Sequence, residues 1–236
     1  MDCTSPTPIY IRSRCGCTTA ANLNIVEHAA AHPSAPWLCY DSSVTQREFS
    51  IVYYLQGEEE QRIRRLQLEL AEVTGSRKCL TSWTPHLTLG SGIIVPEDRQ
   101  IALETTLSRI AEVQKPLLVN LLDFGGTSQW PGAREGITSP FVLWTNVETT
   151  ADLLALFDRI RDEVTSRYET FYPRIVDYIP HVTLAYGDLT ASGFSAGRQF
   201  LHAHSLRGSA TISHVALVEH HPTLDTEYRR FIFGAR

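Results

Sequence analysis

The sequence predicts a duplicated fold of mixed strands and helices, with two halves of similar build. A strand, a long amphipathic helix and a second strand follow one another twice along the chain. The second strand of each half carries the pattern Pro-His-x-Thr-Leu, as PHLTL at residues 85–89 and as PHVTL at residues 180–184. Because Phe49–His86 and Phe141–His181 have similar spacings, we interpret this order as an internal duplication of about 90 residues.

Apolar spacing and breaker residues define the elements of the first half. Residues 49–55 have the composition of a buried strand, and residues 58–73 have helical apolar spacing that ends at Gly75, a usual C-cap residue. The remaining elements expected here are a strand over 83–95, a helix over 96–114 that starts with proline, and a strand over 116–124.

The second half repeats this order and then adds further elements. A strand over 140–147 precedes a helix over 149–168, whose apolar residues share one face. The expected elements that follow are a strand over 178–187, a weaker helix near 193–203, and two strands over 208–221 and 227–234.

The chain divides into an irregular beginning and one large domain. Residues 1–47 are rich in proline and small polar residues, so we expect an extension of unknown role with a short helix near 19–31. Residues 48–236 form the predicted domain, with pseudo-symmetric lobes at roughly 48–125 and 138–236. At 236 residues, 43% of them hydrophobic, the chain is long enough to bury a sizeable core.

Charge and hydropathy limit the classes of partner. The formal net charge is −5 and no block of consecutive basic residues occurs, which disfavours a long nucleic acid and favours a small ligand. No run of about 18 apolar residues is present, and the N-terminus lacks the pattern of a secretory signal. We therefore expect a cytoplasmic protein, monomeric and without a membrane partner.

Metal ligands are not expected to carry the function. Five cysteines without a repeated spacing do not predict a disulfide framework. A zinc site is a weaker alternative whose ligands would be Cys3, Cys15, Cys17 and Cys39. The distal histidines match no zinc signature; they are His202, His204, His214, His220 and His221. We expect neither a metal nor a cofactor.

The paired motif predicts acid–base chemistry on a phosphate. Residues i and i+2 of a strand face the same side, so His86 projects with Thr88, and His181 with Thr183. Near pH 7 two imidazoles can supply one neutral base and one protonated acid. Threonine hydroxyls can donate hydrogen bonds to phosphate oxygens. If the halves pack about a pseudo-two-fold axis, all four side chains face one groove suited to in-line attack on a phosphodiester.

The two motifs, together with YIPHVTLAYGDLT at residues 178–190, resemble the 2H phosphoesterase superfamily. This group holds bacterial 2′,5′ RNA ligase-like proteins and cyclic nucleotide phosphodiesterases. The resemblance covers about residues 48–236. It implies a bilobal α+β fold with an antiparallel sheet in each lobe and the groove between the lobes. It also implies metal-independent hydrolysis of 2′,3′-cyclic phosphates to 2′-phosphates, with His86, Thr88, His181 and Thr183 as the matching residues.

Further candidates lie on aromatic and loop residues. Tyr178, and either Tyr53 or Tyr54, are candidates to stack on a base, with Tyr53 preferred; ordinary core or rim aromatics are the alternative. The glycine-rich loop over 124–136 carries Trp130 and Arg134. It is either a lid that brings arginine to phosphate or a plain linker between the lobes.

Three functions therefore remain in view. The first is an enzyme that hydrolyses cyclic nucleotides or the cyclic phosphate end of a short RNA. The second is a module that binds a nucleotide in the same groove without turnover. The third is an RNA end-processing or 2′,5′ RNA ligase-like enzyme. Histidines in both motifs favour the first, because a pure binder needs neither.

Overall fold

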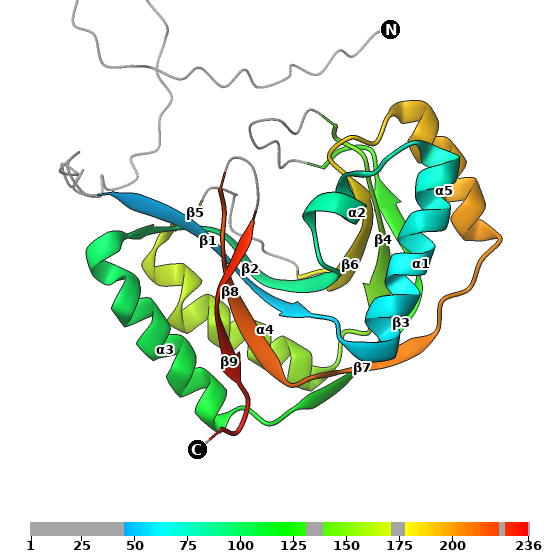
Figure 1. Ribbon diagram of the computed structural model, residues 1–236. Helices are drawn as coiled ribbons and strands as arrows, with labels where there is room; N and C mark the ends of the chain where they lie inside the picture. Colours follow the sequence, from blue (N-terminus) through cyan, green and yellow to red (C-terminus); the bar gives the residue numbers. More distant parts are fainter. Residues whose placement is uncertain (1–44, 131–138, 171–177, 222–224, 236) are drawn as a thin grey trace, which may run out of the picture. The chain divides into compact units, whose positions relative to one another are not determined.

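The computed structural model describes residues 45–130, 139–170, 178–221 and 225–235 (Figure 1). All of these residues belong to one compact unit. The expected extension over 1–47 and its short helix lie almost wholly outside the described residues, as do the four cysteines of the alternative zinc site. The remaining cysteine, Cys79, is a buried free thiol, and burial raises its pKa to about 12.

The long helices lie where the apolar spacing predicts them. Gly75 ends the first helix in a left-handed conformation, φ 77°, and its N–H donates to the Ala71 carbonyl. Thr150 and Thr190 each begin a helix as N-caps, because their hydroxyls accept from the N–H three residues on. The helices are α1 (Gly57–Thr74), α2 (Lys78–Ser82), α3 (Gln100–Val113), α4 (Ala151–Glu163) and α5 (Ala191–His202), of which the sequence does not predict α2.

Nine strands in the described residues form one antiparallel sheet. They are β1 (Gln46–Tyr54), β2 (His86–Pro96), β3 (Leu117–Thr127), β4 (Val142–Val147), β5 (Glu169–Thr170), β6 (His181–Tyr186), β7 (Gly208–Ile212), β8 (His214–Glu219) and β9 (Thr226–Ile232). Their order across the sheet is β7-β3-β4-β6-β2-β1-β8-β9, with β5 paired to β2. The expected α+β fold class is confirmed.

The two motif strands meet in the middle of this sheet. β2 and β6 pair through Leu87 and Val182, and each is flanked by the strand that starts its own half, β1 or β4. Outside these pairs the halves exchange strands, since β3 pairs with β4 and β8 pairs with β1. The expected lobe boundaries at 125 and 138 therefore do not separate the two halves of the sheet.

The strand expected over 208–221 is two strands. It breaks at Ser213, and β7 and β8 lie in opposite halves of the sheet. The sheet must curl for one residue to connect them. The hydroxyl of Tyr53 on β1 donates to the Thr211 carbonyl on β7 at 3.0 Å, which is a direct contact between the two halves.

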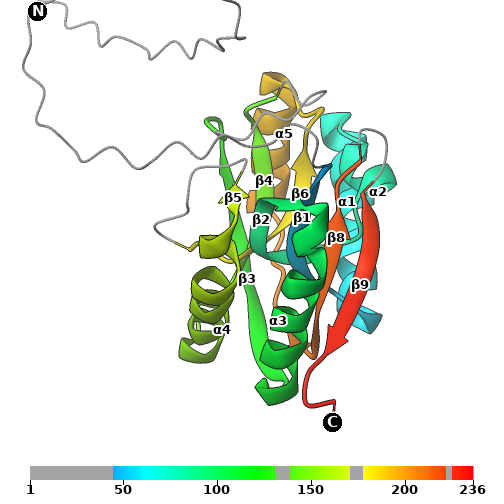
Figure 2. The same cartoon turned by 90° about the vertical axis from the view of Figure 1, so that its left-hand side faces the viewer.

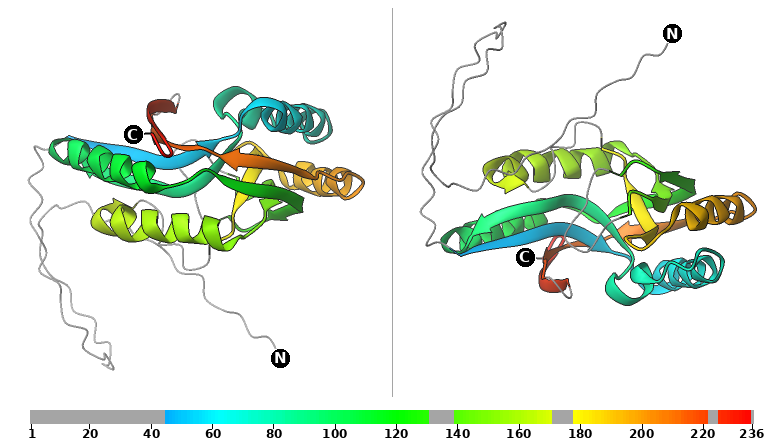
Figure 3. Two further views of the ribbon diagram at one scale, coloured as in Figure 1. Left: turned by 90° about the horizontal axis from the view of Figure 1, so that it is seen from below. Right: turned by 90° about the horizontal axis from the view of Figure 1, so that it is seen from above.

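The four longer helices cover one face of the curled sheet in two pairs. α1 packs beside α5 and against β6, while α4 packs beside α3 and against β2. Figure 2 shows α3 with α4, and both views of Figure 3 show α1 with α5 at the other end of the sheet. The buried side chains of the helices form one core with sheet residues such as Leu87, Val182 and Leu217. The opposite face of the motif strands is therefore the one on which a functional site can lie.

Candidate active site

The strand register brings the four motif side chains together on one face of the sheet. Leu87 and Val182 pair across β2 and β6 and are buried in the core. Their neighbours His86, Thr88, His181 and Thr183 therefore point to the other side, which we call the histidine face. Extended by one residue, the antiparallel register sets His86 beside Thr183 and Thr88 beside His181.

Both imidazoles are oriented in the same way. His86 Nδ1 lies 2.7 Å from the Thr84 carbonyl, and His181 Nδ1 lies 2.8 Å from the Ile179 carbonyl. A carbonyl only accepts, so each Nδ1 carries the hydrogen and each Nε2 is left for a proton transfer. The partner is two residues upstream in both motifs, across the proline that precedes each histidine.

The prolines fix the two motifs in equivalent places. The Pro85 carbonyl accepts from the Leu55 N–H, and the Pro180 carbonyl accepts from the Val147 N–H, both at 2.9 Å. Proline lacks an N–H, so each stands immediately before its strand, where no ladder donor is needed. The two halves thus hold their histidines with the same set of backbone contacts.

Buried side chains hold the backbone carbonyls of the motif threonines. The hydroxyl of Tyr178 donates to the Thr88 carbonyl at 2.8 Å, and the amide of Gln67 on α1 donates to the Thr183 carbonyl at 3.1 Å. The ring of Tyr178 stacks on Phe157 of α4 at 3.9 Å. Tyr178 therefore packs on the core side, and its expected role in stacking on a base is wrong.

The choice of Tyr53 over Tyr54 is also wrong. Tyr53 pairs with Leu87, is 2% exposed, and contacts the ring of His214 in the core. Tyr54 pairs with His86, and its ring meets that imidazole edge-on, with centroids 6.2 Å apart and an interplanar angle of 79°. Tyr54, rather than Tyr53, thus lies on the histidine face.

Aromatic rings surround His181. The ring of Trp144 on β4 lies 5.3 Å from the His181 ring, and that of Trp130 lies 5.7 Å from it. Trp130 also meets Tyr186 at 6.4 Å, and Tyr186 stacks on Trp83 at 5.6 Å with an interplanar angle of 19°. We call Trp83, Trp130, Trp144 and Tyr186 the aromatic rim. Of the two loop residues expected to act, Trp130 lies beside His181 and Arg134 lies outside the described residues.

A glycine on the neighbouring strand gives Trp144 its place. Gly125 of β3 pairs with Trp144, and a Cβ at Gly125 would come within 2.5 Å of the indole nitrogen. That nitrogen donates to the side-chain oxygen of Asn146 at 2.7 Å, and Asn146 pairs with His181. A side chain at position 125 would displace the indole from the histidine face.

Charged groups gather on the side of His86. Asp225 accepts from the indole N–H of Trp83 at 3.0 Å and lies 2.8 Å from Nδ1 of His220. The His181 side of the face carries tryptophans instead. The two halves are therefore alike in backbone and different in the chemistry around each histidine.

Burial lowers the pKa of both histidines. For His86 the largest cause is burial, which the Thr84 carbonyl opposes, while a charge on His181 lowers the pKa further. For His181 burial again lowers the pKa and the Ile179 carbonyl opposes it. Each imidazole is thus neutral at a lower pH than in water, and a charge on one disfavours a charge on the other.

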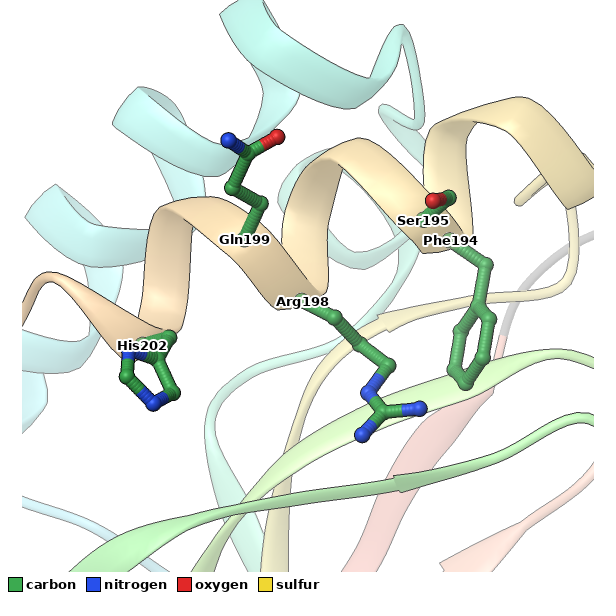
Figure 4. A pocket seen from close by; sticks show the side chains of 5 residues that line it. All are labelled: Phe194, Ser195, Arg198, Gln199 and His202. Carbon is green, nitrogen blue, oxygen red and sulfur yellow. The ribbon is translucent and has the colours of Figure 1, made fainter.

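Two other features lie apart from the motif residues. Within the described ranges, no three His, Cys, Asp or Glu side chains are grouped so that they could hold a metal ion. A surface hollow of about 410 Å³ runs along one helix, α5 (Figure 4). Its lining residues are Phe194, Ser195, Arg198, Gln199 and His202.

Sequence reasoning missed most of the aromatic rim. Alternation along β4 could have found Trp144, which pairs with Thr183 as Val52 pairs with Thr88 in the other half. It could not have found Tyr186. A register shift in the β4–β6 pair places Tyr186 on the same face as Thr183 although it stands three residues further along the strand.

Comparison with known proteins agrees with the fold. No protein-family model matches the sequence, and no curated protein matches it. Among solved structures, TT0787 of Thermus thermophilus matches with a TM-score of 0.56 and 18% identity, over 80% of this chain and 99% of that one. A crystal structure described as that of a phosphoesterase matches with a TM-score of 0.55 and 16% identity, over 80% of this chain and 99% of that one.

Escherichia coli LigT, in a structure complexed with 3′-AMP, matches with a TM-score of 0.56 and 16% identity, over 81% of this chain and 100% of that one. At this level of identity the likeness concerns the fold. None of the helices in the described ranges is long and apolar enough to cross a membrane. The chain shares its fold with LigT and with the structure described as a phosphoesterase, which agrees with the resemblance stated from the two motifs.

Proposed function

We propose that the protein is a metal-independent phosphodiesterase that hydrolyses 2′,3′-cyclic phosphates of nucleotides, or of short RNA ends, to 2′-phosphates. The observation that carries the proposal is the matched orientation of His86 and His181. Both donate Nδ1–H to a backbone carbonyl and keep Nε2 for a proton transfer on the face that they share with the motif threonines. Two such imidazoles on one face can supply the general base and the general acid that cleavage of a phosphodiester requires.

The reaction balances without another reagent. The neutral histidine takes a proton from water at Nε2 as the water oxygen bonds to phosphorus. The charged histidine gives its Nε2 proton to the 3′ oxygen as the bond from that oxygen to phosphorus breaks. The product carries a 2′-phosphate and a free 3′-hydroxyl. The two histidines have then exchanged protonation states, which proton exchange with solvent restores.

Thr88 and Thr183 are proposed to hold the phosphate. Each stands across the strand pair from the histidine of the other motif, so the phosphate would lie among four polar side chains. Their hydroxyls donate to the nonbridging oxygens, where negative charge grows as water attacks. The carbonyl contacts from Tyr178 and Gln67 fix the backbone that carries these hydroxyls.

The nucleoside is proposed to lie over the aromatic rim. Trp130 and Trp144 contact His181, and Tyr186 and Trp83 continue the rim from Trp130 toward the His86 side. A base stacked on such rings gains about 1–3 kcal/mol. LigT, which shares the fold, has been crystallised with 3′-AMP and with phosphate. These complexes support a small nucleotide as the ligand proposed for this chain.

Two alternatives use the same face. A module that binds a nucleotide without turnover would need the aromatic rim and the threonines only, so the matched imidazoles favour an enzyme. An RNA end-processing or 2′,5′ RNA ligase-like enzyme would hold a longer strand. The net charge of −5 disfavours contacts to many phosphates, which makes a small substrate the better proposal.

The purified protein should hydrolyse 2′,3′-cyclic mononucleotides in the presence of EDTA, because both proton transfers are assigned to side chains. Phosphorus NMR of the product identifies a 2′-phosphate. The value of kcat/KM should change little with salt, and little when the substrate is an RNA oligomer with the same cyclic end. Loss of turnover in EDTA, restored by added metal, would contradict the mechanism. A large, salt-sensitive preference for the oligomer would favour RNA end processing instead.

A further inference from the structure

A hydrogen-bonded chain outside the two motifs links β1 to the segments that follow β8 and precede β9. Asp225, directly before β9, lies 2.8 Å from Nδ1 of His220, whose Nε2 lies 2.7 Å from the hydroxyl of Ser50 on β1. The other carboxylate oxygen of Asp225 accepts from the indole N–H of Trp83 at 3.0 Å. Trp83 stands three residues before His86, so this network adjoins the first motif.

The chemistry of the partners fixes the protons in this network. A carboxylate only accepts, so Nδ1 of His220 carries the hydrogen, and in the neutral ring Nε2 accepts from the Ser50 hydroxyl. The order Asp-His-Ser is that of a hydrolase triad, but Ser50 is 5% exposed in the middle of a strand. The Ser50 hydroxyl therefore serves only as a hydrogen-bond partner of His220. The group of this network that can influence His86 is the negatively charged carboxylate of Asp225.

Resting on the function proposed above, we propose that Asp225 is a positioning residue that places a negative charge near His86 and fixes the indole of Trp83 against Tyr186. It does the first through its place beside Trp83 and His220, and the second through the hydrogen bond to the indole. One carboxylate would thus adjust both the acid–base pair and the edge of the aromatic rim.

Several charged and titratable groups of the described residues lie around His86. His181 faces it from β6, Tyr54 from β1, His220 from the end of β8 and Asp225 from just before β9. Arg64 of α1 donates to the hydroxyl of Thr84, whose carbonyl holds Nδ1 of His86. The negative charge of Asp225 raises the pKa of His86, against the larger effect of burial and against the effect of a charge on His220, which lowers it. Glu227 on β9 also carries a negative charge near Tyr54, but it forms an ion pair with Arg230.

The direct test is an NMR titration of the His86 imidazole in the wild-type protein, in Asp225→Asn and in Glu227→Gln. Asparagine keeps an oxygen for the Trp83 N–H and removes the charge, and its NH2 group then faces Nδ1 of His220, so the neutral His220 ring has to carry its hydrogen on Nε2 instead. We expect the pKa of His86 to fall in Asp225→Asn and to stay at its wild-type value in Glu227→Gln, which removes a negative charge two residues further along the chain. Equal pKa values of His86 in all three proteins would overturn the proposal.

This titration needs no turnover, so it separates failure of the inference from failure of the proposed function. In an active enzyme, the limb of the pH profile that belongs to His86 should move to lower pH in Asp225→Asn. Movement of the upper limb identifies His86 as the acid, and movement of the lower limb identifies it as the base. A profile that shifts equally in Glu227→Gln would show a general effect of charge and contradict the assignment.

The role toward Trp83 has its own measurement. Asp225→Ala removes the acceptor for the indole, whereas Asp225→Asn retains one. We expect the Kd of a 2′-mononucleotide product to rise in Asp225→Ala, toward the value for Trp83→Ala, which should be about 5- to 150-fold above wild type. It should stay near the wild-type value in Asp225→Asn. An unchanged Kd in Asp225→Ala, in a protein with wild-type resistance to urea, would contradict this role.

Discussion

Replacing His86 or His181 by alanine should lower kcat/KM for a 2′,3′-cyclic nucleotide by about 10²- to 10⁴-fold, the usual contribution of a general acid or base. Both imidazoles keep Nε2 for proton transfer on the same face, so each change removes one of the two proton transfers. The effects of the two changes should not add, because a pair that acts as a unit is already disabled by one loss. Steady-state kinetics of both single variants and the double variant measure this.

An exposed histidine supplies the matched control. His202 lies on α5 in the hollow of Figure 4, which contains none of the motif residues, so His202→Ala should keep wild-type kcat/KM. Product binding should survive better than turnover in the motif variants, because the threonines and the aromatic rim remain. Wild-type hydrolysis by the double variant would overturn the catalytic assignment of both histidines.

Replacing Thr88 or Thr183 by valine should lower kcat/KM by about 10- to 150-fold, since a hydrogen bond to a charged group contributes about 1.5–3 kcal/mol. Valine keeps the branched shape of threonine and loses only the hydroxyl. Serine at the same position keeps the hydroxyl, so Thr88→Ser and Thr183→Ser should retain most of the activity.

The valine variants also distinguish the phosphate role from a role in folding. Both threonines are half-buried and their backbone carbonyls are held by Tyr178 and Gln67, contacts that a change of side chain does not remove. The urea midpoint should therefore change little. If the valine variants lost stability in proportion to activity, the threonine hydroxyls would support the fold. The proposal that they donate to the phosphate would then be contradicted.

The duplication makes the centre of the fold predictable from the sequence. In each Pro-His-x-Thr-Leu strand the side chains alternate between the two faces of the sheet, so the histidine and the threonine of a motif share a face. This follows from local geometry alone. The helix ends at Gly75 and Thr150 follow from equally local chemistry. These features need no knowledge of which strands are neighbours.

The remaining features of the site depend on which distant strands pair, and local sequence patterns do not reveal this. The exchange of β3 and β8 between the halves of the sheet brings Gly125 beside Trp144, and the β8–β9 connection brings Asp225 to Trp83. Alternation leaves two neighbouring tyrosines on β1 as equivalent choices, and only the pairing of Tyr54 with His86 separates them. Sequence reasoning misassigns Tyr178 because nothing in its local sequence shows that its ring stacks on Phe157 in the core.

The pH dependence of kcat/KM in the wild-type enzyme and in the two single histidine variants tests the central claim most directly. The proposed reaction needs one neutral and one charged imidazole, so the wild-type profile should be bell-shaped. Burial lowers the pKa of both histidines from their ordinary value of about 6.5, so the maximum should lie below about pH 6.5 and activity should fall as the acid deprotonates at higher pH. Each alanine variant should lose one limb, a different one for His86 than for His181. Profiles that keep both limbs in the two variants would contradict the account, because other groups would then supply the acid and the base.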